Sequence, residues 1–343
     1  MGNVSQQSSS HPPDSQKDGI VIGVDIGGTK IAAGIVDGKG RILNQTRTPM
    51  IAHDGAESGL AAVVCAISSV SAEVIAHQTS IRAIGICSPG PLNPAEGIIV
   101  NPPNLPCWRN FPITAEVAKI HRVPVMLDND ANAAALAEVL WGAGRGYRNV
   151  FYVTIGTGIG TGIVFDNRIY HGRTGAAGEG GHMSIDYNGP RCGCGKPGCI
   201  EALAAGPAIA KRARHKLKEN PGCQSLMREL AGGDGSNVTS EIVSKAYAAG
   251  DYLAKEVLKE TVDLLSRWLG NVIDLLDPEV IIIGGGVAEM LSSFFEAIRA
   301  QLPSCCVNSR CQEIPLLMAH YGSQAGIAGA AALCWASEKS VVR

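Results

Sequence analysis

The sequence predicts an α/β fold of two lobes with a cleft between them. The main observation is a pair of similar sequence segments within the chain. "VDIGGTKIAAGIV" begins at Val24 and "VTIGTGIGTGIVF" begins at Val153, and both predict a strand, a glycine turn and a second strand. The chain has 343 residues, enough for two cores, and 42 of them are glycine. The pair indicates a duplicated fold that binds a polyphosphate from both sides, although two unrelated glycine hairpins remain an alternative.

The first lobe is predicted to span residues 19–130. After the opening hairpin come an alternating strand in "GRILNQTRTPM" and a helix over residues 57–78. "IRAIGICSPGPLNP" predicts a buried strand, and "VPVMLDNDANAAALAE" a short strand before an alanine-rich helix. We expect a C-terminal helix over residues 323–340 to pack back on this lobe. The polar, Ser-, Gln- and Pro-rich residues 1–18 are predicted to be a disordered leader.

The second lobe is predicted to span residues 131–322. It opens with the second hairpin, from Asn149, and ends with "PEVIIIGGGVAEM", a buried strand that enters a glycine turn and a helix. Helices are predicted between them over residues 201–219, 224–231, 239–250 and 252–276.

Charge and hydropathy exclude several classes of protein. The 29 basic and 31 acidic side chains give a formal charge of −2, and no basic stripe predicts a nucleic-acid partner. The run "EVIIIGGGVA" is far shorter than the roughly 18 residues of a membrane span, and the start lacks an apolar signal region. We therefore expect a cytoplasmic protein without a membrane partner, in which 11 cysteines do not form a disulfide framework.

The first glycine turn has the residues that bind phosphate. Asp25 ends a strand and is followed by Gly27, Gly28, Thr29 and Lys30. Glycines let backbone N–H groups face an anion, the hydroxyl and the ammonium add donors, and the carboxylate can hold Mg²⁺ through water.

Two further glycine turns are predicted to contact the nucleotide. Gly156, Thr157 and Gly158 form the second, and Gly284 and Gly285 are predicted to form a wall beside a purine. Neither of the first two turns matches the P-loop pattern or the dinucleotide-binding fingerprint.

A cysteine-rich segment begins at His182: "HMSIDYNGPRCGCGKPGCIE". A disulfide would leave one of its three thiols unpaired, and the CxxC spacing of a redox motif is absent. Glycines between the thiols allow the chain to curl around one ion, so a metal site is favoured.

These motifs together resemble a known family. "VDIGGTK", "VTIGTGIGTG" and "IIIGGGVA", in this order, resemble the superfamily of actin, hexokinase and the heat-shock ATPases. "NLPCW", "DNDANAAALAE", "EGGH" and "CGCGKPGCIE" resemble the ROK family of glucokinases, other sugar kinases and sugar-responsive repressors. The resemblance covers the chain from about residue 19 and implies the two-lobed actin-like (ribonuclease H-like) fold.

The resemblance implies a ligand set for each group. A structural Zn²⁺ would be held by His182, Cys192, Cys194 and Cys199. The sugar would be bound by Gly90, Asn104, Asn129, Asp130, Glu179, His182 and Glu201. In this scheme His182 uses one ring nitrogen for zinc and the other for the sugar.

The catalytic carboxylate is less clear from the residues. Asp128 and Asp130 both precede an alanine-rich helix, where helix capping is the ordinary role of Asp and Asn. The residues alone do not choose between them. The resemblance implies that Asp130 is the general base and that Asp128 is structural.

The expected function is an ATP- and Mg²⁺-dependent hexose kinase that phosphorylates glucose, with fructose, mannose or an N-acetylhexosamine as alternative substrates. Pro91 stands where animal N-acetylmannosamine kinases carry arginine, which argues mildly against that sugar. A non-catalytic sugar-sensing repressor is the alternative from another class. Such repressors carry a helix-turn-helix before the first glycine turn, and residues 1–18 show no helical pattern. The family resemblance also implies a homodimer or homotetramer.

Overall fold

The computed structural model describes residues 19–76 and 80–341. The predicted leader, residues 1–18, and the end of the helix predicted over 57–78 lie outside the described residues. Within the described part of the chain, no helix is both long and apolar enough to span a bilayer.

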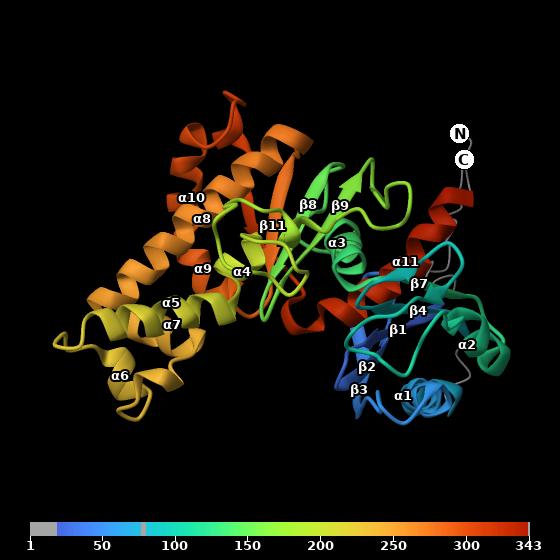
Figure 1. Cartoon of the computed structure of the whole chain (residues 1–343). Coiled ribbons are helices and arrows are strands. Elements are labelled where there is room, and N and C mark those ends of the chain that lie inside the picture. The colour runs from blue at the N-terminus through green and yellow to red at the C-terminus, as the bar shows by residue number, and fades with distance from the viewer. Residues whose placement is uncertain (1–18, 77–79, 342–343) are drawn as a thin grey trace, which may run out of the picture.

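Two five-stranded sheets form the centres of the two lobes (Figure 1). The strands of the first sheet, in spatial order, are β3 (Ile42–Pro49), β2 (Lys30–Val36), β1 (Ile20–Ile26), β4 (Ile81–Ser88) and β7 (Val125–Asn129). Those of the second are β10 (Arg168–Ile169), β9 (Ile159–Phe165), β8 (Val150–Ile155), β11 (Val280–Gly284) and β12 (Leu316–Met318).

The two sheets share one plan. In each, a glycine-turn hairpin supplies an antiparallel pair, β1 with β2 and β8 with β9. The first strand of each hairpin also pairs in parallel with a later strand, β1 with β4 and β8 with β11. The predicted duplication of a strand–turn–strand unit in two lobes is therefore confirmed.

Helices cover both faces of each sheet. α1 (Ala56–Ala76) and α2 (Ile113–His121) contact the first sheet, and α5 (Gly206–Glu219) and α8 (Tyr252–Leu276) pack with the second. α3 (Asp130–Trp141) and α11 (Ala325–Val341) lie between the sheets and contact each other (Figure 1). The shorter helices are α4 (Ile200–Ala204), α6 (Leu226–Leu230), α7 (Ser240–Ala248), α9 (Ala288–Leu291) and α10 (Phe295–Gln301).

The alternation of apolar side chains along β1 explains this sandwich. Ile22 and Val24 pack in a core with Val63 and Ile67 of α1, whereas Val21 points to the other face and packs with α11. Successive side chains of a strand point to opposite faces, so a strand with apolar side chains on both faces needs a cover on each.

Two small-residue contacts set how closely α11 approaches its neighbours. A Cβ on Gly85 of β4 would lie 1.7 Å from the carbonyl oxygen of Ala330, and one on Gly329 would lie 2.6 Å from the backbone of Ala133 in α3. The alanine- and glycine-rich sequences of α3 and α11 are therefore a packing requirement of the middle layer.

Two connections that follow α3 and β12 meet at Glu138. The first connection leaves the C-terminus of α3 for β8, and the second leads from β12 to α11. The Glu138 side chain is buried, and its Oε2 accepts the Ala143 N–H at 2.8 Å. Its Oε1 accepts the N–H groups of His320 at 2.8 Å and Tyr321 at 3.1 Å. One carboxylate thus holds both connections.

The structure differs from the sequence prediction in several elements. The helix predicted over residues 201–219 is two helices, because Ala205 is extended and Pro207, at the start of α5, has no N–H to donate to Leu203. The carbonyl oxygen of Leu203 accepts from Arg212 instead. α2, α10, β10 and β12, and the small hairpin of β5 (Leu92–Asn93) and β6 (Ile98–Ile99), were not predicted, and most are too short for a periodic pattern.

Candidate active site

Three polar residues line up at one edge of the first sheet. Asp25 of β1 is in register with Cys87 of β4, and Cys87 is in register with Asp128 of β7. Since these strands are parallel, their carboxyl ends meet at the same edge, where α/β proteins bind ligands. Asp130 follows at once as the first residue of α3.

Asn129 caps helix α3, and the Asp130 carboxyl, whose Oδ1 accepts the Ala131 N–H at 2.8 Å, is not the cap. Asn129 Oδ1 accepts the N–H groups of Ala131 at 2.9 Å and Asn132 at 3.4 Å. Asp130 has an exposed surface, yet protein atoms surround its carboxyl closely enough that desolvation raises its pKa. This environment favours a carboxylate that can take a proton more readily than one in water.

Asp25 lies in the electric field of Asp130. Burial raises the pKa of Asp25, and the negative charge of Asp130 raises it further, while a hydrogen bond from Cys87 and the charges of Lys30 and Arg47 lower it. The Cys87 Sγ is 3.6 Å from Asp25 Oδ1. A carboxyl whose ionisation is disfavoured by a second carboxylate suits a divalent cation, whose charge would offset the repulsion.

The first glycine turn is closed by a hydrogen bond from the Gly27 N–H to the Lys30 carbonyl, 2.9 Å. A Cβ on Gly28 would lie 2.8 Å from the Asn104 carbonyl oxygen, so the loop that carries Asn104 packs directly on this turn. Thr29 and Lys30 are exposed and available to a ligand.

The second and third glycine turns lie side by side. The Gly156 N–H donates to the Gly158 carbonyl at 2.9 Å, with Thr157 exposed between them. Gly284 is in register with Thr154, and Gly285 has φ +92°, with a Cβ position 2.4 Å from the Ile155 carbonyl oxygen. A side chain at position 285 would therefore push the two turns apart.

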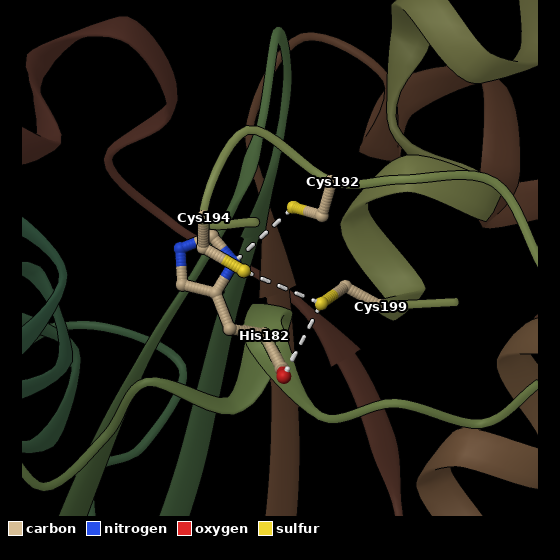
Figure 2. Close-up of side chains that lie close together, drawn as sticks. All are labelled: His182, Cys192, Cys194 and Cys199. Atoms are coloured by element: carbon tan, nitrogen blue, oxygen red, sulfur yellow. Dashed lines mark hydrogen bonds between the residues drawn. The ribbon is translucent and has the colours of Figure 1, made fainter. Parts of the chain in front are cut away.

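The cysteine segment and its histidine come together in one cluster (Figure 2). The ligand atoms of His182, Cys192, Cys194 and Cys199 all lie within 4.8 Å of one another. Cys192 Sγ is 3.6 Å from His182 Nδ1, and Cys194 Sγ is 3.6 Å from Cys199 Sγ. Ligands of a tetrahedral Zn²⁺ are separated by roughly 3.5–3.8 Å, given Zn–S and Zn–N bonds of about 2.3 and 2.0–2.1 Å. These residues fit a metal ion of that size.

Without a cation, the cluster disfavours ionisation of the Cys199 thiol. Burial, followed by hydrogen bonds with Cys194 and Cys192, raises the pKa of Cys199 to about 12. All 11 cysteines of the chain are free thiols. A bound cation would offset this penalty, because metal ligands are deprotonated.

Two glutamates flank the cluster. His182 Nδ1 faces the thiols and lies 3.8 Å from Glu201 Oε1, whereas Nε2 lies 3.9 Å from Glu179 Oε2. Glu201 also accepts the Ile159 N–H at 3.0 Å, directly after the second glycine turn, and a Cβ on Gly158 would lie 2.5 Å from its Oε2. Glu201 therefore joins the cysteine segment to a glycine turn, which the sequence did not reveal.

The remaining predicted site residues form a separate group. A Cβ on Gly90 would lie 3.9 Å from Asn129 Nδ2, so these two predicted sugar contacts are neighbours. Among the described residues, no hydrogen bond or ion pair joins Asp130 to Glu179, His182 or Glu201. The structure thus holds an aspartate group on the first lobe and a cysteine–glutamate group on the second.

Two residues beside Asp25 were missed as parts of the site. The sequence prediction did not include Cys87 or Gly326 among the site residues, yet Cys87 Sγ is 3.6 Å from Asp25 Oδ1 and a Cβ on Gly326 would lie 2.4 Å from Asp25 Cγ. The sequence did contain a signal for Cys87: it lies at the end of a predicted buried strand, and Asp25 and Asp128 lie at the ends of two other predicted strands. Gly326 lies far from Asp25 in the sequence and gave no such signal.

Comparison with known proteins places the chain in a family. A model described as "ROK family" matches residues 21–337. This chain belongs to the ROK family. Its two-lobed architecture is the actin-like ATPase fold of the ROK sugar kinases.

Three relatives of this ROK protein span nearly its whole length. A glucokinase of Thermotoga maritima is 34% identical over 313 residues, 91% of this chain and 96% of the relative. An N-acetylmannosamine kinase of Escherichia fergusonii is 32% identical over 314 residues, 91% and 97% of the two chains. A ROK family glucokinase from Streptomyces griseus, solved in complex with glucose and AMPPNP, is 34% identical with a TM-score of 0.77 and covers 92% of this chain and 99% of its own.

Proposed function

We propose that this ROK protein is an ATP-dependent hexose kinase that phosphorylates D-glucose at its 6-hydroxyl. The observation that carries the proposal is Asp130, which starts α3 at the edge of the first sheet, has a raised pKa, and raises the pKa of Asp25 by its charge. The full-length similarity to glucokinases supports the same reaction class.

Asp130 is the general base of the proposed reaction. It accepts the proton of the sugar 6-hydroxyl as the bond from that oxygen to the γ-phosphorus of ATP forms and the bond from the γ-phosphorus to the bridging oxygen of ADP breaks. Asn129 holds the start of the helix, so the Asp130 carboxyl is not needed as its N-cap.

Asp25 is the proposed Mg²⁺ contact, through water, and the ion supplies charge that stabilises the transferred phosphoryl group. Backbone N–H groups of the turn from Gly27 to Lys30 and of the turn from Gly156 to Gly158 face the phosphates in this proposal. The turn at Gly284 and Gly285, packed against Ile155, forms the wall beside the purine.

The cysteine cluster is the proposed structural zinc site. Zinc on His182 Nδ1 would leave Nε2, next to Glu179, for a sugar hydroxyl. Glu179, His182 and Glu201 then bind the sugar from the second lobe, and Gly90, Asn104 and Asn129 bind it from the first. Carboxylates accept hydrogen bonds from vicinal hydroxyls, which is the pattern that a pyranose presents.

N-acetylmannosamine is the second candidate substrate. The kinase for that sugar from Escherichia fergusonii matches this chain at 32% identity over 91% of its length. Pro91, at a position where animal N-acetylmannosamine kinases carry arginine, favours glucose over this candidate.

The test is a coupled ADP-release assay with Mg²⁺–ATP and a panel of glucose, mannose, fructose, N-acetylglucosamine and N-acetylmannosamine. We expect the highest kcat/KM with glucose, and glucose 6-phosphate as the product by ³¹P NMR. A higher kcat/KM with N-acetylmannosamine would replace glucose by the second candidate. Sugar binding without ADP release, for every sugar, would contradict the kinase and favour a sugar sensor.

We also propose a cytoplasmic homodimer or homotetramer. Free thiols and the use of ATP support the location, and the family resemblance supports the assembly. Light scattering coupled to size-exclusion chromatography measures the subunit number directly.

A further inference from the structure

A histidine–aspartate pair joins the two lobes beside the first turn of α3. His171 follows β10 of the second sheet, and its Nε2 lies 2.6 Å from Oδ2 of Asp128 in β7 of the first. Both residues line a cavity of about 1190 Å³, and the Asp128 side chain is only 4% exposed. The hydrogen bond with Asp128 raises the pKa of His171, as expected for an imidazolium in an ion pair.

Within the described lining of this cavity, His171 and Asp128 pair with each other and not with the other charged residues. Other charged residues that line it are Glu96, Asp166, Arg168 and Arg173. Among the described residues, none of these four forms a hydrogen bond or ion pair with His171 or Asp128.

Asp128 in turn holds the start of the helix that carries Asp130. Its Oδ1 accepts the Asn129 N–H at 2.7 Å and the Asn132 Nδ2 at 3.0 Å. One oxygen of Asp128 therefore binds the first turn of α3, and the other binds His171. Asp130 lies within that turn, one residue after the Asn129 cap.

His171 also begins the segment that ends in the proposed sugar contacts. Its carbonyl accepts the Ala177 N–H at 3.1 Å, and a Cβ on Gly178 would lie 3.4 Å from Asn132 Oδ1. Gly178 accepts the Thr161 hydroxyl, whose oxygen accepts the Gly180 N–H at 2.9 Å. The segment from residue 171 to 182 is thus fixed to β9 and lies against α3.

We propose that His171 is a positioning residue, which orients Asp128 and thereby holds Asp130 in line with the sugar hydroxyl presented by the Glu179–His182 segment. The inference rests on the proposed kinase function and gives Asp128 a role beyond helix structure. A displaced catalytic group costs turnover more than ground-state binding, because alignment matters most in the transition state.

The test compares His171→Leu, which removes the donor, with His171→Gln, whose amide can still donate to Asp128. We expect His171→Leu to lower kcat about tenfold or more, with the KM for the sugar changed less than about threefold. His171→Gln should stay within about threefold of wild type. In an Asp128→Asn background, His171→Leu should add little, because the two residues act as one unit.

The matched control is His215→Leu on α5. His215 also pairs with a carboxylate, Glu219 at 3.2 Å, but both side chains are exposed and remote from α3. This variant should retain wild-type kcat. Thermal midpoints are measured for every variant, because a purely structural histidine would lower the midpoint while folded enzyme keeps its kcat.

A wild-type kcat in His171→Leu, whatever its thermal midpoint, would overturn the proposal. An equal loss of kcat in His171→Gln and His171→Leu would also overturn it. If His171→Leu does not fold, His171→Asn replaces it, since its amide is one carbon too short to reach Asp128, and the same kcat loss is expected. Absence of turnover in the wild-type protein would instead overturn the proposed function itself.

Discussion

At the scale of single residues, the chemistry depends on the Asp130 carboxyl. Asp130→Asn preserves the shape of the side chain but removes the proton acceptor, and general-base catalysis contributes about 10²–10⁴-fold to rate. We expect kcat to fall by about that factor while glucose binding, measured by isothermal titration calorimetry, stays within about threefold. Equal loss of binding and turnover would indicate that Asp130 serves the fold instead.

The raised pKa of Asp130 predicts a pH dependence. The carboxylate form is needed to accept the proton, so kcat/KM should fall as pH decreases through the pKa of Asp130. Because desolvation raises that pKa above the ordinary 3.8, the midpoint of this acidic limb should lie above 3.8. A pH–rate profile over the stable range measures it. A limb at or below the ordinary aspartate value would contradict the buried environment described for Asp130.

At the scale of elements, α11 packs closely against the first sheet. Gly85→Ala would put a Cβ 1.7 Å from the Ala330 carbonyl oxygen, where only backbone movement can relieve the clash. We expect the free energy of unfolding to fall by about 3 kcal/mol or more, since overpacking costs typically 1–3 kcal/mol and a backbone clash exceeds it. Gly222→Ala is the control, because nothing lies within 4 Å of its Cβ position. Equal urea midpoints for the two variants would contradict this packing.

The two connections that meet at Glu138 predict a second stability effect. Glu138→Leu would remove the acceptor of three backbone N–H groups, from Ala143, His320 and Tyr321. An unsatisfied buried donor costs about 1–3 kcal/mol, so we expect a loss of at least about 3 kcal/mol in urea unfolding. Glu296→Leu should cost under about 1 kcal/mol, because Glu296 is 80% exposed and its ion pair with Arg299 is a surface one. A small loss in Glu138→Leu would show that water satisfies these donors.

At the scale of the whole molecule, local patterns predicted the repeated units but not their connections. The hairpins, the buried strands and α8 follow from periodicity and glycine turns, which are local properties. The register of Asp25, Cys87 and Asp128, the link from Glu201 to Ile159 and the meeting of two connections at Glu138 involve residues far apart in sequence. Such contacts depend on tertiary packing, so no local pattern reports them.

The central claim is that a zinc-organised segment of the second lobe presents a sugar to Asp130 of the first. The most direct measurement is the rate of glucose phosphorylation as a function of zinc bound per chain, with zinc determined by elemental analysis on the same samples after graded chelation. We predict that activity falls in proportion to bound zinc and returns when zinc is restored. Metal-free protein that remains folded by circular dichroism and phosphorylates glucose at the untreated rate would contradict the account.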